Sequence, residues 1–149
     1  MKPTEILSDE HRVIEQVLSA LEKMADECEA TTKLDAAAAK DAVDFFRNFA
    51  DRCHHGKEEA RLFPLLEQHG FSPECGPTAV MRYEHEQGRA HVRGMLAAAE
   101  KAERGDAAAP GEFVAHARGY IALLREHIQK EDHCLFAMSD ISLGMKLVF

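Results

Sequence analysis

The sequence predicts an all-α protein, an antiparallel up-down four-helix bundle with a short C-terminal tail. Two observations predict this fold: apolar residues recur at spacings of three and four along four stretches, and almost no stretch alternates as a strand would. The chain has 149 residues, of which 46% are apolar and 30% charged. Such a chain is long enough for one domain with a real core and leaves no comfortable room for two. We therefore expect residues 1–149 to form a single domain.

The first helix is expected over about residues 8–29 and the second over about residues 35–68. Ser8 is suited to be the N-cap of the first helix. Gly70 is expected to stop the second. The apolar positions that recur at helical spacing are Ile14, Leu18 and Leu21 in the first helix and Val43, Phe46 and Ala50 in the second.

The third helix is expected over about residues 77–104 and the fourth over about residues 110–138, each opened by a proline in its first turn. A glycine follows the third helix and marks its end. The remaining tail, SDISLGMKLVF, is apolar and receives no secondary-structure assignment. It is expected to pack against the bundle or against a partner.

Composition excludes several classes of protein. The formal net charge of −8 argues against binding to the phosphate backbone of nucleic acid, which requires a basic face. No apolar run approaches the length of a membrane span, and the start MKPTEILSDEH lacks the core of a signal peptide. The four cysteines are isolated and form no C-x-x-C pair, so free thiols are expected. We therefore expect a cytoplasmic protein without nucleic-acid or membrane partners.

Two segments of the chain repeat one pattern, HHGKEEARLF from residue 54 and HIQKEDHCLF from residue 127. Both give a His-x-x-x-Glu pair, His54 with Glu58 and His127 with Glu131. A spacing of four residues places both side chains on one helix face, one turn apart. Each pair is therefore suited to hold one metal ion with an imidazole and a carboxylate.

Four histidines, one on each expected helix, fall at one level of the bundle. Residues on two antiparallel helices lie at one level when the midpoint of their numbers falls in the turn that joins the helices. The midpoints are 32.5 for His11 and His54, 69.5 for His54 and His85, and 106 for His85 and His127, all in expected turns. Each histidine also continues the apolar stripe of its helix and so points inward. An unpaired polar group there would cost a few kcal/mol, so these side chains need a common partner.

Glu58 and Glu131 would point into the same layer, where two buried carboxylates repel each other. A cation between them removes this conflict, and four imidazoles with two carboxylates suit a first-row transition metal. If both carboxylates bridge, the six side chains offer roughly eight bonds, whereas two octahedral ions need about twelve. The remaining positions allow an oxo or hydroxo bridge and an exogenous ligand such as O₂. Two ions are therefore favoured over one.

At these residues the sequence resembles the hemerythrin-like family of His-His-Glu cation-binding domains. The matching segments are DEH11R, H54HGKE58 with its following LFP, EH85EQGR and H127IQKE131D, in family order over nearly the whole chain. The resemblance implies a non-haem di-iron site (Fe²⁺/Fe³⁺) in a four-helix bundle, with bridging carboxylates and histidines completing the ends. The ligands that it implies are His11, His54, Glu58, His85, His127 and Glu131.

The third helix departs from the family pattern. Oxygen-carrying hemerythrins have a His-x-x-x-His pair there, whereas Arg89 stands four residues after His85. One terminal imidazole is therefore missing, which shifts the expectation from reversible oxygen carriage to sensing or reactive chemistry. His55 is an alternative ligand, as are Glu59 or Asp132 if the register shifts by one residue.

The remaining histidines are expected to play no part in the site. His91 and His133 each lie six residues from a candidate ligand and are expected on the surface. His69 belongs to a helix end. His116 shares the face of His127 three turns away and is expected in the core or capping the layer.

The leading functional hypothesis is a di-iron protein that binds, senses or reacts with O₂, NO or peroxide. A second is a di-iron oxidase or peroxidase, with a catalase-like activity suggested by resemblance alone. A third is an iron-responsive binding module, in which the apolar tail from Ile141 to Phe149 contacts a protein partner or a second copy. Whether the protein turns over a substrate is left open by the sequence.

Overall fold

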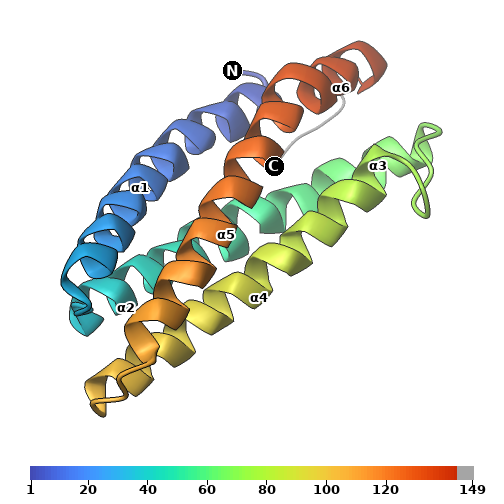
Figure 1. Ribbon diagram of the computed structural model, residues 1–149. Helices are drawn as coiled ribbons and strands as arrows, with labels where there is room; N and C mark the ends of the chain where they lie inside the picture. The colour runs from blue at the N-terminus through green and yellow to red at the C-terminus, as the bar shows by residue number, and fades with distance from the viewer. Residues whose placement is uncertain (144–149) are drawn as a thin grey trace.

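Four long helical rods run antiparallel in the computed structural model, which describes residues 1–143 (Figure 1). The first rod is α1 (Pro3–Thr31) and the third is α4 (Pro77–Glu103). The second rod consists of α2 (Ala36–Phe45), η1 (Phe46–His55), η2 (Glu58–Leu62) and α3 (Phe63–Gln68), and the fourth of α5 (Ala109–Lys130), η3 (Glu131–Leu135) and α6 (Phe136–Leu143). No strand occurs among these described residues. The prediction of an all-α bundle is confirmed.

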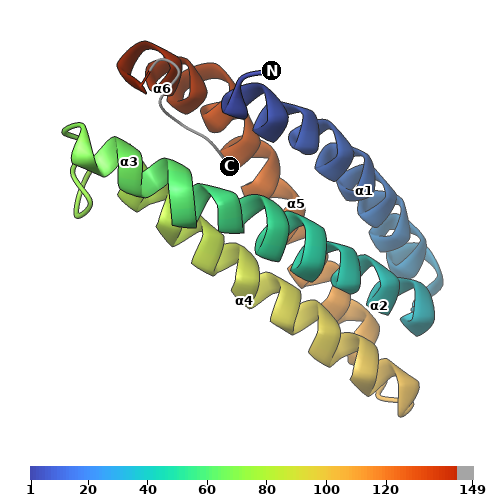
Figure 2. The same cartoon turned by 180° about the vertical axis from the view of Figure 1, so that it is seen from behind.

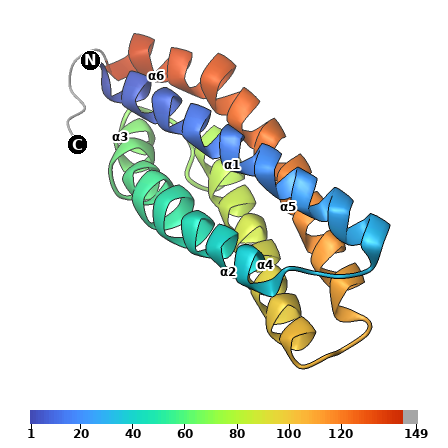
Figure 3. The same cartoon turned by 90° about the vertical axis from the view of Figure 1, so that its left-hand side faces the viewer.

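The rods pack as a square, because α1 contacts α5, α5 contacts α4, and α4 contacts α2. Figure 2 shows α2 and α3 beside α4, and Figure 3 shows α1 beside α5. Gly70 and Gly105 end their helices with φ of +102° and +82°, a conformation that glycine adopts without steric cost. The turns therefore fall where the sequence places them.

The predicted start of the first helix at Ser8 is wrong, because α1 begins at Pro3. Thr4 and Leu7 are buried, so the first turn is held by packing that a capping signal does not reveal. The hydroxyl of Ser8 donates a hydrogen bond of 2.7 Å to Oδ1 of Asp132 on the fourth rod instead of capping a helix.

The fourth rod also extends further than predicted, to Leu143 rather than to residue 138. Leu143 is buried in an apolar cluster, and this packing holds the added turn in place. The first residues of the predicted tail are therefore helical. The proposed partner surface lies largely outside the described residues, which end at 143.

The core consists of two apolar clusters. The larger fills the end of the bundle nearer the α1–α2 turn and includes Leu18, Phe46 and Tyr120. The smaller includes Leu7, Phe63 and Phe136 at the other end. On each rod, the predicted site residues lie between members of the two clusters. Apolar side chains thus cover the polar layer above and below.

Both repeated segments depart from α-helical geometry. In the first segment, His54 and His55 end the π-helical stretch η1 and Glu58 begins η2. In the second segment, Glu131 begins the π-helical stretch η3. Wide π turns occur frequently at functional sites. In the described part of the chain, no helix combines the length and the apolarity that crossing a bilayer requires.

Candidate metal centre

The structure brings all six predicted side chains into one buried layer, together with the alternative candidate His55. None is more than 4% exposed, although all are ionisable. The seven residues are His11, His54, His55, Glu58, His85, His127 and Glu131. Carboxylates are almost never fully buried unless they are paired or bind a metal, and a buried imidazole also needs a polar partner.

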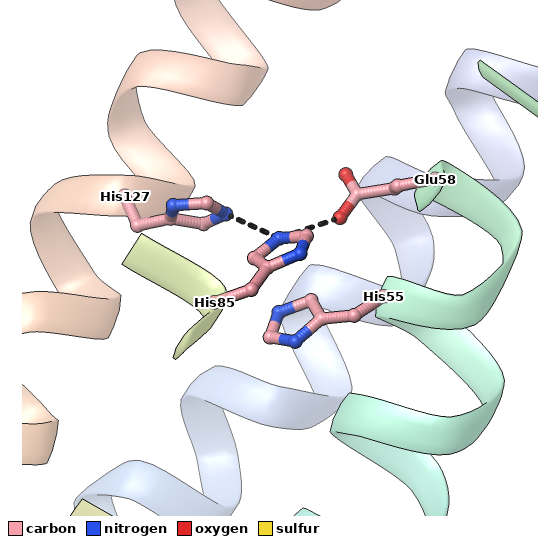
Figure 4. A group of neighbouring side chains, drawn as sticks. All are labelled: His55, Glu58, His85 and His127. Atoms are coloured by element: carbon pink, nitrogen blue, oxygen red, sulfur yellow. Dashed lines mark hydrogen bonds and ion pairs between the residues drawn. The ribbon is translucent and has the colours of Figure 1, made fainter. Parts of the chain in front are cut away.

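The seven side chains form two groups that share Glu58. The first group, drawn in Figure 4, is His55, Glu58, His85 and His127, and the second is His11, His54, Glu58 and Glu131. In each group the nitrogen or oxygen atoms offered by the four side chains all lie within 4.8 Å of one another. Glu58 therefore lies between two places that could each hold a cation.

Several atoms at the centre of this layer lack partners. Nε2 of His85 lies 3.2 Å from Nε2 of His127 and 3.3 Å from Oε1 of Glu58 (Figure 4). Yet among the described residues 1–143 neither carboxylate oxygen of Glu58 has a hydrogen-bond partner, and the same holds for Nε2 of His54 and Oε2 of Glu131. Buried polar atoms without partners cost free energy, and a cation would satisfy these atoms together. The residues present therefore fit a metal centre.

The other ring nitrogen of every histidine in the layer points outward to a carboxylate. The Nδ1 partners are Asp132 for His11 (2.8 Å), Glu10 for His54 (3.0 Å), Asp51 for His55 (3.3 Å), Glu59 for His85 (2.8 Å) and Glu84 for His127 (2.9 Å). When Nδ1–H donates to a carboxylate, the Nε2 lone pair is left to face the centre. The ring orientations are thus set for metal binding.

These outer carboxylates are in turn held by cationic side chains. The pairs are Arg12 with Asp132, Lys57 with Glu10, Lys130 with Glu84, and Arg89 with both Asp51 and Glu59. The structure thus places Glu59 and Asp132, the two alternative ligands of a shifted register, outside both metal-binding groups. They orient His85 and His11.

A model of the hemerythrin HHE cation-binding domain matches residues 2–139 of the chain. The chain belongs to this family. Uncharacterized proteins of Mycobacterium bovis and of two Mycobacterium tuberculosis strains, CDC 1551 and H37Rv, are 29% identical to it over 138 residues. The match covers 92% of this chain and 53% of each relative, so the chain spans about half their length. No solved structure matches the chain.

Electrostatics in this hemerythrin domain separate the two central carboxylates. Burial and the neighbouring charge of Glu131 raise the pKa of Glu58 well above its usual range. Burial alone would also raise the pKa of Glu131, but the charge of His127 and hydrogen bonds outweigh burial and hold it well below its usual range. Burial lowers the pKa of His127, yet Glu131 and Glu84 outweigh it and raise the pKa to about 9. Without metal, these shifts favour the protonated forms of Glu58 and His127.

His55 brings a fifth imidazole into the buried layer of this hemerythrin domain. Its ring stacks on that of His85, with centroids 3.7 Å apart, and it belongs to the first group. Arg89, at the position of the missing histidine, pairs with Asp51 and Glu59 outside the layer. The fifth imidazole thus comes from the second rod, and the doubled histidine in HHGKE was its signal in the sequence.

Sequence reasoning missed Glu10, Glu84 and Asp51 as partners of the site. A signal was present for two of them, since Glu10 and Glu84 directly precede the candidate ligands His11 and His85. Each contacts a histidine of the neighbouring rod, not the histidine beside it in sequence.

Histidines outside the layer differ partly from expectation. His133 is exposed and His69 lies at the end of α3, both as predicted. His91 was expected on the surface, which is wrong: it is half-buried between α4 and α5, where its Nδ1 lies 3.3 Å from Nδ1 of His116. Two glycines allow this packing, because a Cβ on Gly94 or Gly119 would lie within 2.6 Å of the His116 or His91 ring.

Proposed function

We propose that this hemerythrin domain binds two iron ions and uses them to bind, sense or react with O₂, NO or peroxide. The observation that carries the proposal is the pair of four-residue groups that share Glu58 and contain unpartnered buried atoms. Three imidazoles and one carboxylate would face one ion. Two imidazoles and two carboxylates would face the other.

The donor set favours iron over the hard cations. Imidazole nitrogens suit iron, copper, zinc and nickel, whereas Ca²⁺ and Mg²⁺ prefer oxygen ligands. When bound, iron would supply the redox chemistry. The chain itself contributes the outer carboxylates that orient the imidazoles and the two apolar clusters that cover the layer above and below.

A second candidate function is turnover of peroxide or O₂ by an oxidase or a catalase-like peroxidase. A cavity of about 270 Å³ reaches His55 and His85, which would give a reactant access to one of the two groups. The space for one water molecule in the liquid is about 30 Å³, so the cavity is much larger than a diatomic gas requires.

The test is anaerobic reconstitution with Fe²⁺, followed by metal analysis and Mössbauer spectroscopy. We expect about two irons per chain in a coupled pair, as two four-residue groups would hold. Separate titrations with O₂, NO and peroxide, read optically, then distinguish the two candidates. Stoichiometric binding supports carriage or sensing, and many turnovers of peroxide per chain support an enzyme. Iron content well below one per chain, or a stable preference for zinc in iron-replete medium, would overturn the proposal.

A further inference from the structure

The cavity beside the proposed metal centre has the size of an organic molecule rather than of a gas. Its volume is about 270 Å³, and its lining runs from the exposed Arg47 and Arg93 to the buried His55, His85 and Tyr120. It therefore leads from the molecular surface to one side of the layer. Pockets for small organic ligands have this concave form and approximate size.

One wall of the cavity is apolar. Phe46, Val92 and Leu96 line it, and the Tyr120 ring packs edge-on against Phe46 with centroids 4.9 Å apart. Gly88 also lines it and presents no side chain, and a Cβ there would lie 3.3 Å from the Tyr120 ring. Such a wall suits the apolar body of a ligand, since removing that body from water is favourable.

Apart from this wall and the two histidines, the residues that line the cavity are charged, and most of them are positive. Three arginines and one aspartate, Asp51, line the cavity of a chain whose net charge is −8. Arg89 is held by Asp51, Glu59 and Glu86. Arg47 and Arg93 differ, because neither side chain makes a hydrogen bond or ion pair with any residue in the described range 1–143. Two guanidinium groups at the cavity mouth are thus available for an anion.

We propose that this cavity binds a small organic monocarboxylate. Arg47 and Arg93 hold its carboxylate, because the planar guanidinium fork matches a carboxylate in two parallel hydrogen bonds. Phe46, Val92 and Leu96 cover its apolar body. The inference rests on the proposed function in one respect: the body would lie beside His55 and His85, which are proposed to hold one iron.

The experiment measures binding of phenylacetate to the full chain by isothermal titration calorimetry, with its uncharged isostere phenylacetamide as the comparison. The test variant is Arg47→Gln/Arg93→Gln. The matched control is Arg61→Gln/Arg104→Gln, which removes two exposed arginines that do not line the cavity. We expect one phenylacetate per chain, bound about tenfold tighter than phenylacetamide or more, because charge-assisted hydrogen bonds are roughly twice as strong as neutral ones. The test variant should lose this advantage, and the control should keep it within about twofold.

A second variant, Val92→Phe, fills the cavity from its apolar side. It should abolish binding of both compounds, while circular dichroism shows the same helix content as the parent chain. Equal binding of phenylacetate and phenylacetamide would overturn the inference, as would no saturable binding or unchanged phenylacetate binding in Arg47→Gln/Arg93→Gln.

Iron content measured in the same samples separates this inference from the proposed function. Phenylacetate binding that disappears with iron but survives loss of both arginines would identify the anion as a simple iron ligand and overturn the inference. Binding that depends on the arginines in a chain that holds no iron would support the cavity and overturn the metal centre. A chain with two irons and no phenylacetate binding would support the metal centre and overturn the inference about the cavity.

Discussion

The two halves of the bundle, residues 3–68 and 77–143, build the candidate centre with the same parts. In each half the lysine before the central glutamate pairs with an acid on the neighbouring rod, Lys57 with Glu10 and Lys130 with Glu84. That acid then accepts a hydrogen bond from His54 in the first half and from His127 in the second. The repeated Lys-Glu-acid pattern is thus a repeated hydrogen-bond frame.

The acid after each central glutamate reaches into the other half. Glu59 accepts from Nδ1 of His85, and Asp132 accepts from Nδ1 of His11. Each half therefore orients a histidine of the other, and neither half contains a complete site. This exchange explains why the pattern recurs at both ends of the chain.

Two of the positions at which the halves differ bear on the candidate centre. His55 corresponds to Ile128 in the repeat, and Gly88 corresponds to Ile14. The first replacement adds a fifth imidazole, and the second leaves room for the cavity where the buried Ile14 fills the other half. A shared frame orients the histidines, and a few asymmetric residues decide which of the two groups the cavity reaches.

Glu58→Gln should have the largest effect, because Glu58 is the residue common to both groups. We expect loss of both irons and an affinity more than about 100-fold lower, beyond the 10–100-fold typical of outer partners. Anaerobic Fe²⁺ titration measures it. Glu131→Gln should do less, since Glu131 belongs to one group.

Glu126→Gln is the matched control for Glu58→Gln, because Glu126 is exposed on α5 outside both groups. Urea unfolding of the metal-free variant separates ligand loss from misfolding. Burial already keeps Glu58 protonated by raising its pKa, so a neutral amide should not lower the free energy of unfolding. Retention of two irons by Glu58→Gln would contradict the shared position.

His55→Ile should have the next largest effect on iron content. The substitution gives the first half the residue that the second half has at the equivalent position, Ile128. One group then retains only three side chains, and we expect iron to fall from about two per chain toward about one. Metal analysis after desalting measures it, with exposed His133→Gln as the control. An unchanged iron content would show that His55 stacks on His85 without binding metal.

The level of the centre could be predicted from the sequence because helix rise and antiparallel packing fix it. His11, His54, His85 and His127 share one layer for this reason alone. The role of His55 did not follow from α-helical periodicity, since η1 is π-helical and the angles of an α-helix do not hold across it.

The outer partners depend on contacts between rods. The reach of Glu10 to His54 is set by how two helices pack, which single-helix periodicity does not contain. Ser8 illustrates the same limit, because its hydroxyl has a tertiary partner in Asp132 and does not cap a helix.

Glu10→Gln and Glu84→Gln test whether the frame acts equally in both halves. Each removes a carboxylate that orients one histidine, and each should weaken iron binding about 10–100-fold. Competition with a chromogenic chelator gives both affinities. A difference of more than about tenfold between the two variants would break the equivalence of the halves.

Proton release should make iron binding depend on pH. The pKa of His127 near 9 means that this imidazole carries a proton near neutral pH, and the raised pKa of Glu58 favours its protonated form, so metal binding must displace protons. Affinity should therefore fall as the pH falls from 8 to 6, by about tenfold per unit for each displaced proton. His54 is the residue of the first half that corresponds to His127, and burial lowers its pKa. In ¹⁵N spectra of the metal-free chain, His54 should therefore be neutral and His127 protonated.

Replacing the His91–His116 pair should have the smallest effect. The equivalent residues of the first half are Val17 and Val43, so His91→Val/His116→Val gives the second half the side chains of the first. The Nδ1 atoms of this pair face each other at 3.3 Å, and no carboxylate among residues 1–143 orients them, unlike every histidine of the centre. Iron affinity should stay within about twofold in the same titration, because a histidine without an orienting partner is not fixed for metal binding. A larger loss would mean that packing of α4 on α5 positions His85 and His127, and that the frame extends beyond the outer carboxylates.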